Sequence, residues 1–396
     1  MPIQYLRLKK GEDRRIRAGH PWIYSNEIDT ASSPLKSFSP GEEVLVQAHD
    51  KSLLGAAYVN PRSLIAARIF SRDPNDRLTE EWITQQIRIA LALRQHLFSG
   101  PYYRLVFSEA DNLPGLVIDR FENDLVVQIN TAGMERQQAL IVQALCDLLP
   151  ATNSVLYRND SQVRDHEGLD TYVKPAFGEP PENIFLEENS VRFIAPLIKG
   201  QKTGWFYDHR LNRARLRQYV SNRRVLDVFS YAGGWSIQAA AYGANSVDCI
   251  EVSDFACDYI LKNAELNHVA EKVKVICDDA FDALKALLQQ HHKYDVIILD
   301  PPAFVKKFKD RKEGLIAYQR LNEFAIKLLV PGGILVTCSC SMHVTMQDII
   351  DILQRVAYRT QSQIQILERG HQGPDHPIHL SIPETDYLKA VVVRKI

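Results

Sequence analysis

The second half of the chain alternates between short aliphatic runs and amphipathic segments, and this alternation limits the possible folds more than any other feature. The expected buried strands are 225–229, 246–251, 273–277, 294–300 and 333–338. The expected helices are 235–242, 254–267, 281–291, 315–329 and 346–358. Parallel strands joined by helical crossovers form a doubly wound sheet. We therefore predict an α/β domain over residues 191–396, with a terminal antiparallel hairpin formed by 364–369 and 388–394.

The first half has a different pattern. Short β-type runs at 44–47, 53–59 and 64–70, separated by turn residues, predict a small all-β module over residues 1–72. After a polar linker at 71–79, a helical pattern covers 81–98. Strands at 116–119 and 125–129 and a helix at 136–149 then predict a central α+β domain over 73–190. A chain of 396 residues is long enough for two or three such domains.

Composition places the chain among ordinary globular proteins. The basic N-terminal segment lacks the apolar core of a secretory signal, and no window resembles a membrane span, so we expect a cytoplasmic protein. Six cysteines in so long a chain are too few for a disulfide framework, which predicts free thiols. No second cysteine or histidine pair has metal-ligand spacing, so no metal is expected. The net charge of −1 gives no sign of a nucleic-acid partner by itself.

Ligands of doubly wound sheets bind at the carboxyl ends of the strands, so the residues that follow each strand are the first candidates. The first turn runs from Asp227 through Phe229 to Gly233 and lacks the G-x-G-x-x-G spacing that a dinucleotide requires. Its acidic residue and loop amides suit the amino-acid end of a methionine derivative. The sequence therefore disfavours a dinucleotide and favours a smaller zwitterion.

The next two strands end in acidic residues that suit an adenosine. Glu251 closes the second strand, where a carboxylate can accept hydrogen bonds from both ribose hydroxyls. Asp278, Asp279 and Ala280 follow the third strand, and Asp279 is placed to accept from an adenine amino group. The alternative is a helix N-cap role for acidic residues at these strand ends, such as Asp254 and Asp278. Taken in order, the positions predict S-adenosylmethionine as the cofactor.

The fourth and fifth strands end in residues that can act on a nucleobase. The fourth runs into Asp300-Pro301-Pro302, whose prolines stiffen the loop, and the fifth ends near Cys338 and Cys340. A thiolate that adds to carbon 6 of cytosine makes carbon 5 nucleophilic. We expect Asp300, protonated or sharing a proton, to bind the base edge. Spacing alone does not choose between the two cysteines, and the Asp-Pro-Pro loop leaves amino-group methylation open, although Ala303 stands where that motif carries an aromatic residue.

Several longer segments resemble one family. Residues 19–25, 111–120, 200–210, 375–377 and 387–389 carry the matching motifs. With them, the chain resembles the bacterial 23S ribosomal RNA large-subunit methyltransferase I family, which has an N-terminal PUA-like β-barrel, a central α+β domain and a C-terminal Rossmann-like class I methyltransferase domain. The resemblance implies methylation of carbon 5 of one cytosine in 23S rRNA, with S-adenosylmethionine as the methyl donor.

The resemblance also implies roles for individual residues. It places the nucleophile on Cys340, with Cys338 as a possible helper. It leaves product release to another base, because Ala303 replaces the second cysteine of related enzymes. The segment that precedes the methyltransferase core adds second-rank cofactor-binding candidates, which are Lys202, Thr203, Asp208 and Arg210.

Basic residues are concentrated in three runs despite the neutral total. Segment 199–224 holds eight basic residues and one acidic residue, and 7–17 and 306–320 are also basic. These runs favour a phosphate-binding track for 23S rRNA, free or within an assembly intermediate, although solvated helix faces explain each run equally well. A homodimer remains open. The remaining functional alternatives are a base-amino or guanine methyltransferase and a non-catalytic RNA-binding assembly factor.

Overall fold

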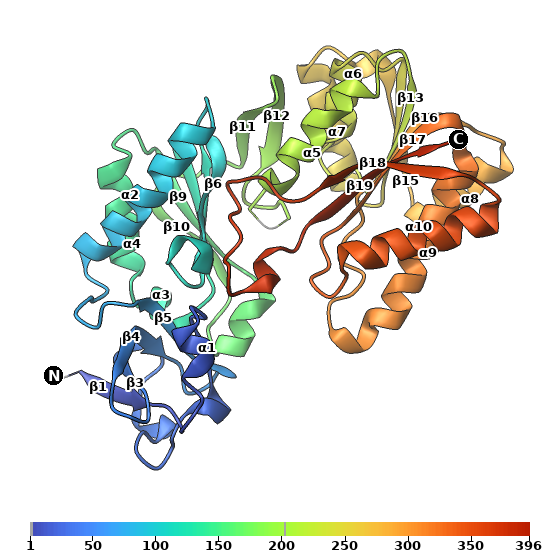
Figure 1. Ribbon diagram of the computed structural model, residues 1–396. Helices are drawn as coiled ribbons and strands as arrows, with labels where there is room; N and C mark the ends of the chain where they lie inside the picture. Colours follow the sequence, from blue (N-terminus) through green and yellow to red (C-terminus); the bar gives the residue numbers. More distant parts are fainter. Residues whose placement is uncertain (1–2, 202) are drawn as a thin grey trace. The chain divides into compact units, whose positions relative to one another are not determined.

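The computed structural model describes residues 3–201 and 203–396 (Figure 1). Its contacts divide the chain into two compact units. The first comprises the chain up to Ile184, Pro196–Tyr207 and Pro374–Thr385, and the second comprises Phe185–Ala195, Asp208–Gly373 and Asp386–Ile396. The division into domains at residues 72 and 190 stays a prediction. Within the described residues, no helix has both the length and the apolar character that crossing a bilayer requires.

The N-terminal part of the first unit is a five-stranded sheet. Its order is β1 (Gln4–Arg7), β3 (Glu42–Gln47), β4 (Leu53–Val59), β5 (Ile65–Ser71) and β2 (Trp22–Tyr24). The three strand-like runs of the sequence are confirmed as β3, β4 and β5. Strands β1 and β2, and the short helix α1 (Arg14–Arg17), were not predicted. Alternate residues of these strands, such as Val44 and Val46, enter a common apolar core.

The rest of the first unit is built on a second five-stranded sheet. Its order is β10 (Tyr172–Gly178), β9 (Ser154–Asn159), β8 (Asp124–Ile129), β7 (Leu116–Phe121) and β6 (Tyr102–Phe107). Its helices are α2 (Glu80–Leu97), α3 (Ala132–Glu135) and α4 (Gln138–Leu148). Helix α2 begins where the sequence predicts it, because the Thr79 side chain accepts a hydrogen bond from the backbone N–H of Trp82. Strands β11 (Asn183–Glu188) and β12 (Val191–Pro196) pair with each other in a separate two-stranded sheet.

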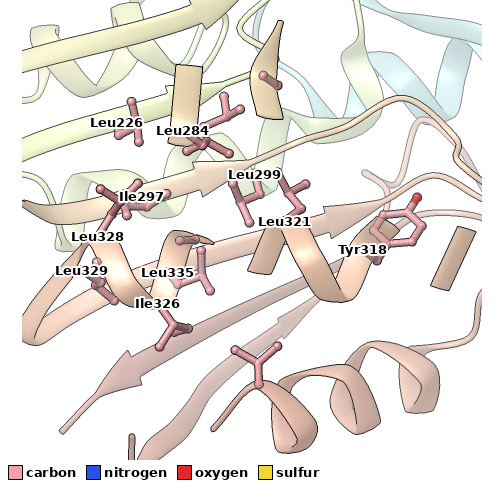
Figure 2. Close-up of a cluster of buried hydrophobic side chains, with 14 of the residues drawn as sticks. Leu226, Leu284, Ile297, Leu299, Tyr318, Leu321, Ile326, Leu328, Leu329 and Leu335 are labelled. Carbon is pink, nitrogen blue, oxygen red and sulfur yellow. The ribbon is translucent and has the colours of Figure 1, made fainter. Parts of the chain in front are cut away.

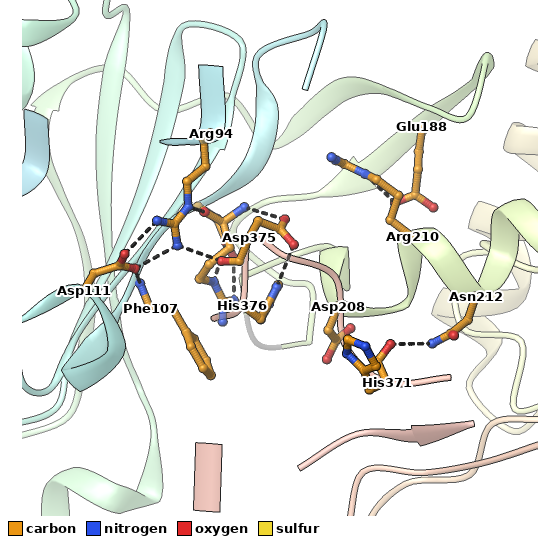
Figure 3. A network of polar contacts seen from close by, with 12 residues as sticks. Arg94, Phe107, Asp111, Glu188, Asp208, Arg210, Asn212, His371, Asp375 and His376 are labelled. Carbon is orange, nitrogen blue, oxygen red and sulfur yellow. Dashed lines mark hydrogen bonds and ion pairs between the residues drawn. The ribbon is translucent and has the colours of Figure 1, made fainter. Parts of the chain in front are cut away.

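A buried arginine attaches the distant segment 374–385 to the first unit. Arg94 of α2 is fully buried and donates to both carboxylate oxygens of Asp111, at 2.6 and 2.7 Å (Figure 3). The same guanidinium donates to the backbone oxygen of Asp375 at 2.8 Å. A buried charge is tolerated only when its hydrogen bonds are satisfied, and here a residue far along the chain supplies one of them. This contact explains why a C-terminal segment belongs to the first unit.

The second unit contains the predicted doubly wound sheet. Its order is β15 (Val273–Cys277), β14 (Ser246–Glu251), β13 (Arg224–Val228), β16 (Tyr294–Leu299), β17 (Leu329–Ser339), β19 (Lys389–Lys395) and β18 (Ile364–Gly370). The first five strands pair in parallel, whereas β19 is antiparallel to both of its neighbours, as expected for the terminal hairpin. The helices are α5 (Arg210–Ala214), α6 (Ser236–Ala241), α7 (Asp254–Leu266), α8 (Ala280–Gln289), α9 (Arg311–Leu328) and α10 (Met346–Thr360).

An apolar core lies between the sheet and helices α8, α9 and α10. Figure 2 shows Leu226, Ile297 and Leu335 of the sheet with Leu321 and Ile326 of α9 in this cluster. These side chains are fully buried. Burying each of them contributes about 1.5–3 kcal/mol. The packed sheet holds the carboxyl ends of its strands in fixed positions, which is the requirement for a binding crevice.

Helix α9 is longer than the sequence predicts. It begins at Arg311 rather than near residue 315, although Gly314 lies in its first turn. The glycine is needed for packing, because a Cβ at this position would collide with the side chain of Val305. The expectation of a later helix start was wrong because glycine ordinarily weakens a helix, whereas here a close tertiary contact requires it.

Candidate active site

The strand-end residues singled out from the sequence gather at one edge of the sheet. Strands β13, β14, β15, β16 and β17 run parallel and end at Val228, Glu251, Cys277, Leu299 and Ser339. Because the carboxyl ends of parallel strands meet at the same edge, the loops that follow them lie at that edge, where ligands of such sheets bind. The cofactor-binding and catalytic candidates in these loops all belong to the second unit.

The turn after β13 holds a carboxylate with one unused oxygen. Asp227 is fully buried, and its Oδ2 accepts a hydrogen bond from the Ser236 backbone N–H at 3.1 Å. Its Oδ1 is buried without a hydrogen-bond partner among the described residues. Burial raises the pKa of this carboxyl to about 7. Such an oxygen suits a cationic ligand group, because an ammonium would satisfy it and favour the carboxylate.

The backbone of the same turn is unusual. Phe229 and Gly233 both have left-handed conformations, with φ of 68° and 83°. A side chain at Gly233 would also bring its Cβ to 2.8 Å from Cγ1 of Ile237. Glycine at this position therefore lets the loop turn sharply into α6. Phe229 is a non-glycine residue in a sparsely populated region, a feature common at functional sites.

Glu251 at the end of β14 is held in place by backbone groups. Its Oε2 accepts from the Tyr231 N–H at 2.8 Å and its Oε1 from the Ser253 N–H at 3.0 Å. The residue is only 8% exposed. Each carboxylate oxygen can accept a second hydrogen bond, so two adjacent hydroxyls of a ribose fit this group.

The acidic pair after β15 is arranged differently from the sequence expectation. Asp279 is the N-cap of α8, and its Oδ1 accepts from the Phe281 and Asp282 N–H groups at 2.8 and 3.3 Å. Ser253, not Asp254, caps α7. The N-cap role considered for Asp254 and Asp278 was therefore wrong. The N-cap is the residue at which the chain enters the helix, and that residue is Ser253 in α7 and Asp279 in α8.

The N-cap hydrogen bonds use Oδ1 of Asp279 and leave its Oδ2 for a ligand. Asp278 and Asp279 are exposed at the crevice edge, and Ala280 is buried as the first residue of α8. The small side chain of Ala280 keeps the start of the helix close to the sheet. The Oδ2 of Asp279 stays available to accept from an amino group.

Asp300 after β16 is oriented by two residues that the sequence analysis did not select. Its Oδ1 lies 3.1 Å from Nε2 of His209, and its Oδ2 accepts from the indole N–H of Trp235 at 2.9 Å. Burial by itself raises the pKa of Asp300, but the His209 imidazole and the Trp235 N–H outweigh it and lower the pKa below the ordinary value. Without a bound base, Asp300 is therefore an ionised carboxylate, and the expectation that it is protonated or shares a proton applies to the state with a bound base.

The hydrogen bonds of Asn212 indicate which nitrogen of His209 carries the proton. The Asn212 amide nitrogen donates to the backbone oxygen of His371 at 3.1 Å (Figure 3). Its amide oxygen accepts from Nη1 of Arg215 at 3.3 Å. This fixes the amide so that its N–H₂ group faces Nδ1 of His209, at 3.4 Å. Nδ1 is then an acceptor and Nε2–H donates to Asp300. The position of His209 between Asp208 and Arg210 was the only sequence signal for it.

The two cysteines near the end of β17 have different surroundings. Cys338 is fully buried within the strand, and burial, followed by the charge of Asp300, raises its pKa well above the ordinary value. Cys340 lies beyond the last strand residue, is partly exposed and has its Sγ 4.0 Å from the backbone oxygen of Pro301. A thiol that stays protonated is a poor nucleophile. The structure thus separates two residues that spacing alone could not.

Cys338 also belongs to a compact group of possible metal ligands. One ligand atom each from His209, Asp300 and Cys338 lies within 4.8 Å of the others. The hydrogen bond between His209 and Asp300 explains the closeness of these groups without an ion.

The second-rank candidates are divided between the two units. Asp208 accepts from the Tyr387 hydroxyl at 2.6 Å. Arg210 lies 3.8 Å from Glu188 (Figure 3). Both belong to the second unit, whereas Thr203 is buried in the first. Lys202 lies outside the described residues.

The basic run at 199–224 is only partly a surface feature. Arg210 and Arg213 are buried, and Arg213 binds both oxygens of the buried Glu188 at 2.6 and 2.9 Å. These two residues cannot contact a phosphate while they are buried, so their assignment to an RNA-binding track was wrong. In contrast, Lys306, Lys307 and Lys309 are exposed just after the Asp300 loop.

Comparisons with known proteins identify the families and relatives that this chain resembles. The profile of the S-adenosylmethionine-dependent methyltransferase family matches residues 116–394, and that of the PUA-like domain matches residues 6–72. A protein from Cronobacter sakazakii named ribosomal RNA large subunit methyltransferase I is 35% identical over 387 residues, which cover 96% of this chain and 97% of the relative.

Two solved structures have a similar fold. One is described as a SAM-dependent methyltransferase from Streptococcus mutans, with a TM-score of 0.83, 19% identity and coverage of 99% of this chain and 100% of that one. The other, a methyltransferase complexed with S-adenosylhomocysteine, has a TM-score of 0.84 with the same identity and coverage.

Proposed function

Because the chain belongs to the ribosomal RNA large subunit methyltransferase I family of S-adenosylmethionine-dependent methyltransferases, we propose that it methylates carbon 5 of one cytosine in 23S rRNA, with Cys340 as the nucleophile. The substrate is the free rRNA or an assembly intermediate. The proposal goes beyond family membership in three respects, which are the base, the atom that is methylated and the covalent mechanism.

The different surroundings of the two cysteines carry the proposal. Cys340 is the more accessible thiol, and its sulfur contacts the Asp300-Pro301-Pro302 loop. A cytosine held at its edge by Asp300 would then lie beside the sulfur. Cys338 is protonated and has no access to a base, so it does not compete as the nucleophile.

The reaction that these residues support has two stages. The Cys340 thiolate forms a bond to carbon 6, and the ring electrons shift so that carbon 5 becomes nucleophilic. Carbon 5 takes the methyl group, whose bond to the sulfonium sulfur breaks and leaves S-adenosylhomocysteine. Carbon 5 then loses its proton to water, the double bond reforms and the carbon–sulfur bond breaks, which returns the thiolate. When the base binds, Asp300 takes up or shares a proton, hydrogen-bonds the base edge and so offsets the negative charge that develops at N3. No cysteine at Ala303 assists release.

The residues at the sheet edge fit S-adenosylmethionine. The buried, unpartnered Oδ1 of Asp227 suits the ammonium, Glu251 suits the ribose and the free oxygen of Asp279 suits the adenine amino group. When bound, the cofactor supplies an electrophilic methyl group. The protein residues hold and orient it.

Access to the base limits the RNA that can react. Carbons 5 and 6 of a paired cytosine are stacked inside the helix, so the target is single-stranded or flipped out. The exposed lysines after the Asp300 loop are placed to bind its phosphates. The PUA-like domain adds further RNA contacts.

The test is to replace Cys340 with serine and Cys338 with serine separately. We expect Cys340→Ser to abolish 5-methylcytosine in 23S rRNA, measured by nucleoside mass spectrometry, while S-adenosylhomocysteine still binds by calorimetry. Cys338→Ser is the matched control and should retain methylation. Full activity of the Cys340→Ser protein overturns the mechanism, and an N-methylated product would instead favour amino-group transfer by the Asp300 loop.

A further inference from the structure

A buried lysine lies across the sheet from the proposed nucleophile. Strand β19 is antiparallel to β17, and Lys389 pairs directly with Ser339, the last residue of β17. The side chain of Lys389 reaches past the end of that strand. Its Nζ donates to the backbone oxygen of Ser341 at 2.7 Å, so it is bonded to the residue that follows Cys340.

The environment of Lys389 is unusual for an amine. The residue is 6% exposed, and its second hydrogen bond goes to the backbone oxygen of Tyr387 at 2.7 Å. An ammonium has three N–H donors, and no third acceptor is found among the described residues. Burial lowers the pKa of Lys389 to about 8, and the charge of Cys340 is the largest influence in the opposite direction. Below that pH, the site therefore holds a buried cation that a nearby anion would stabilise.

Of the other titratable groups near Lys389, Asp348 and Tyr318 are engaged with other residues, whereas Asp386 is exposed. Asp348 of α10 accepts from Thr345 and binds Arg311 at 2.6 Å. Asp386 precedes β19 and also favours the charged lysine. Tyr318 of α9 bonds to Ser341 through its hydroxyl. Among the groups that favour the charged lysine, Cys340 has the largest effect.

We propose that Lys389 is a positioning residue for Cys340: its ammonium, held by the carbonyls of Ser341 and Tyr387, stabilises the Cys340 thiolate and fixes the backbone that presents it. The inference rests on the proposed function, in which Cys340 is the nucleophile. No bond is made to Lys389. Its ammonium stabilises the thiolate before the base binds, and again after the carbon–sulfur bond breaks and the base leaves.

The test measures the ionisation of Cys340 directly and needs no RNA. The full chain is alkylated with iodoacetamide at pH 6 to 10, and the rate at Cys340 is followed by peptide mass spectrometry. In the unmodified chain we expect a midpoint below the ordinary thiol value of about 8.5. In Lys389→Met the midpoint should rise by about one pH unit, so that alkylation at pH 7 slows about tenfold. Lys389→Arg keeps the charge and should restore most of the rate.

Lys395→Met is the matched control. Lys395 lies on the same strand and also donates to two backbone oxygens, those of Ile326 and Leu329, at 2.8 and 2.9 Å. Its loss removes the same kind of contact far from Cys340 along β19 and should leave the alkylation profile unchanged. Binding of S-adenosylhomocysteine reports whether each variant is folded.

Two results would overturn the inference. One is a wild-type midpoint at or above the ordinary thiol value, which requires no variant to fold. The other is a Lys389→Met profile that coincides with the wild-type profile. The proposed function would fail on a different observation, namely full methylation by the Cys340→Ser protein. That result is independent of the alkylation profile.

Discussion

The buried carboxyl group of Asp227 should reduce the stability of the unliganded protein at neutral pH. Its pKa is about 7, whereas the ordinary value is 3.8. A difference of about 3 units, at about 1.4 kcal/mol per unit, corresponds to about 4 kcal/mol. Because the residue is fully buried, solvent screening does not diminish this value much. Replacing the carboxyl by an amide, as in Asp227→Asn, should remove the penalty.

The direction of the pH dependence follows from the raised pKa. Between pH 3.8 and about 7, the folded protein keeps a proton on Asp227 that the unfolded chain has lost. The free energy of unfolding therefore falls as the pH rises through this window, and the full penalty applies above it. Asp227→Asn should be close to wild type in stability at pH 4. At pH 8 it should be more stable by about 2–4 kcal/mol, since the amide oxygen can still accept from Ser236.

The measurement is denaturant unfolding at several pH values without cofactor, with hydrogen exchange of β13 and β14 to assign the transition to the second unit. Asp295→Asn is the control, because Asp295 lies in the neighbouring strand β16 at the edge opposite the crevice and its side chain is 25% exposed. If Asp227→Asn shows the same slope of stability against pH as the wild type, the reasoning about a buried, unpartnered carboxyl is wrong. The expected slope would mean that the site sacrifices stability to hold an acceptor for its ligand.

Two further predictions concern binding and rate. Glu251→Ala removes both acceptors for the ribose. It should weaken S-adenosylhomocysteine binding by at least about 100-fold in calorimetry, since two hydrogen bonds to a charged group at about 1.5–3 kcal/mol each contribute at least about 3 kcal/mol; unchanged affinity would place the ribose elsewhere. His209→Ala removes the group that lowers the pKa of Asp300, so the acidic limb of the methylation pH–rate profile should move to higher pH. An unmoved limb would show that Asp300 does not have to be ionised before the base binds.

Local sequence determined the type and order of most elements in the second unit. Aliphatic runs and helical spacing are properties of neighbouring residues, and a parallel sheet fixes where its strand ends meet. The positions of Asp227, Glu251 and Asp300 at one edge therefore follow from the sequence pattern alone. The start of α9 was missed because Gly314 is required by its close contact with the side chain of Val305, and only tertiary packing brings these two residues together.

The tertiary structure alone decided which side chains meet. His209 orients Asp300, and Lys389 reaches the segment after Cys340, yet each pair is separated by dozens of residues along the chain. The different surroundings of Cys338 and Cys340 also depend on burial in the folded chain, because residues two apart on a strand lie on the same face and their spacing does not distinguish them. Hydrogen bonds, burial and pKa shifts depend on distances through space, and sequence spacing carries that information only within a single helix or strand. The sequence therefore determined that the candidate residues lie at the carboxyl ends of the strands. Only the folded structure determined which side chains contact one another there.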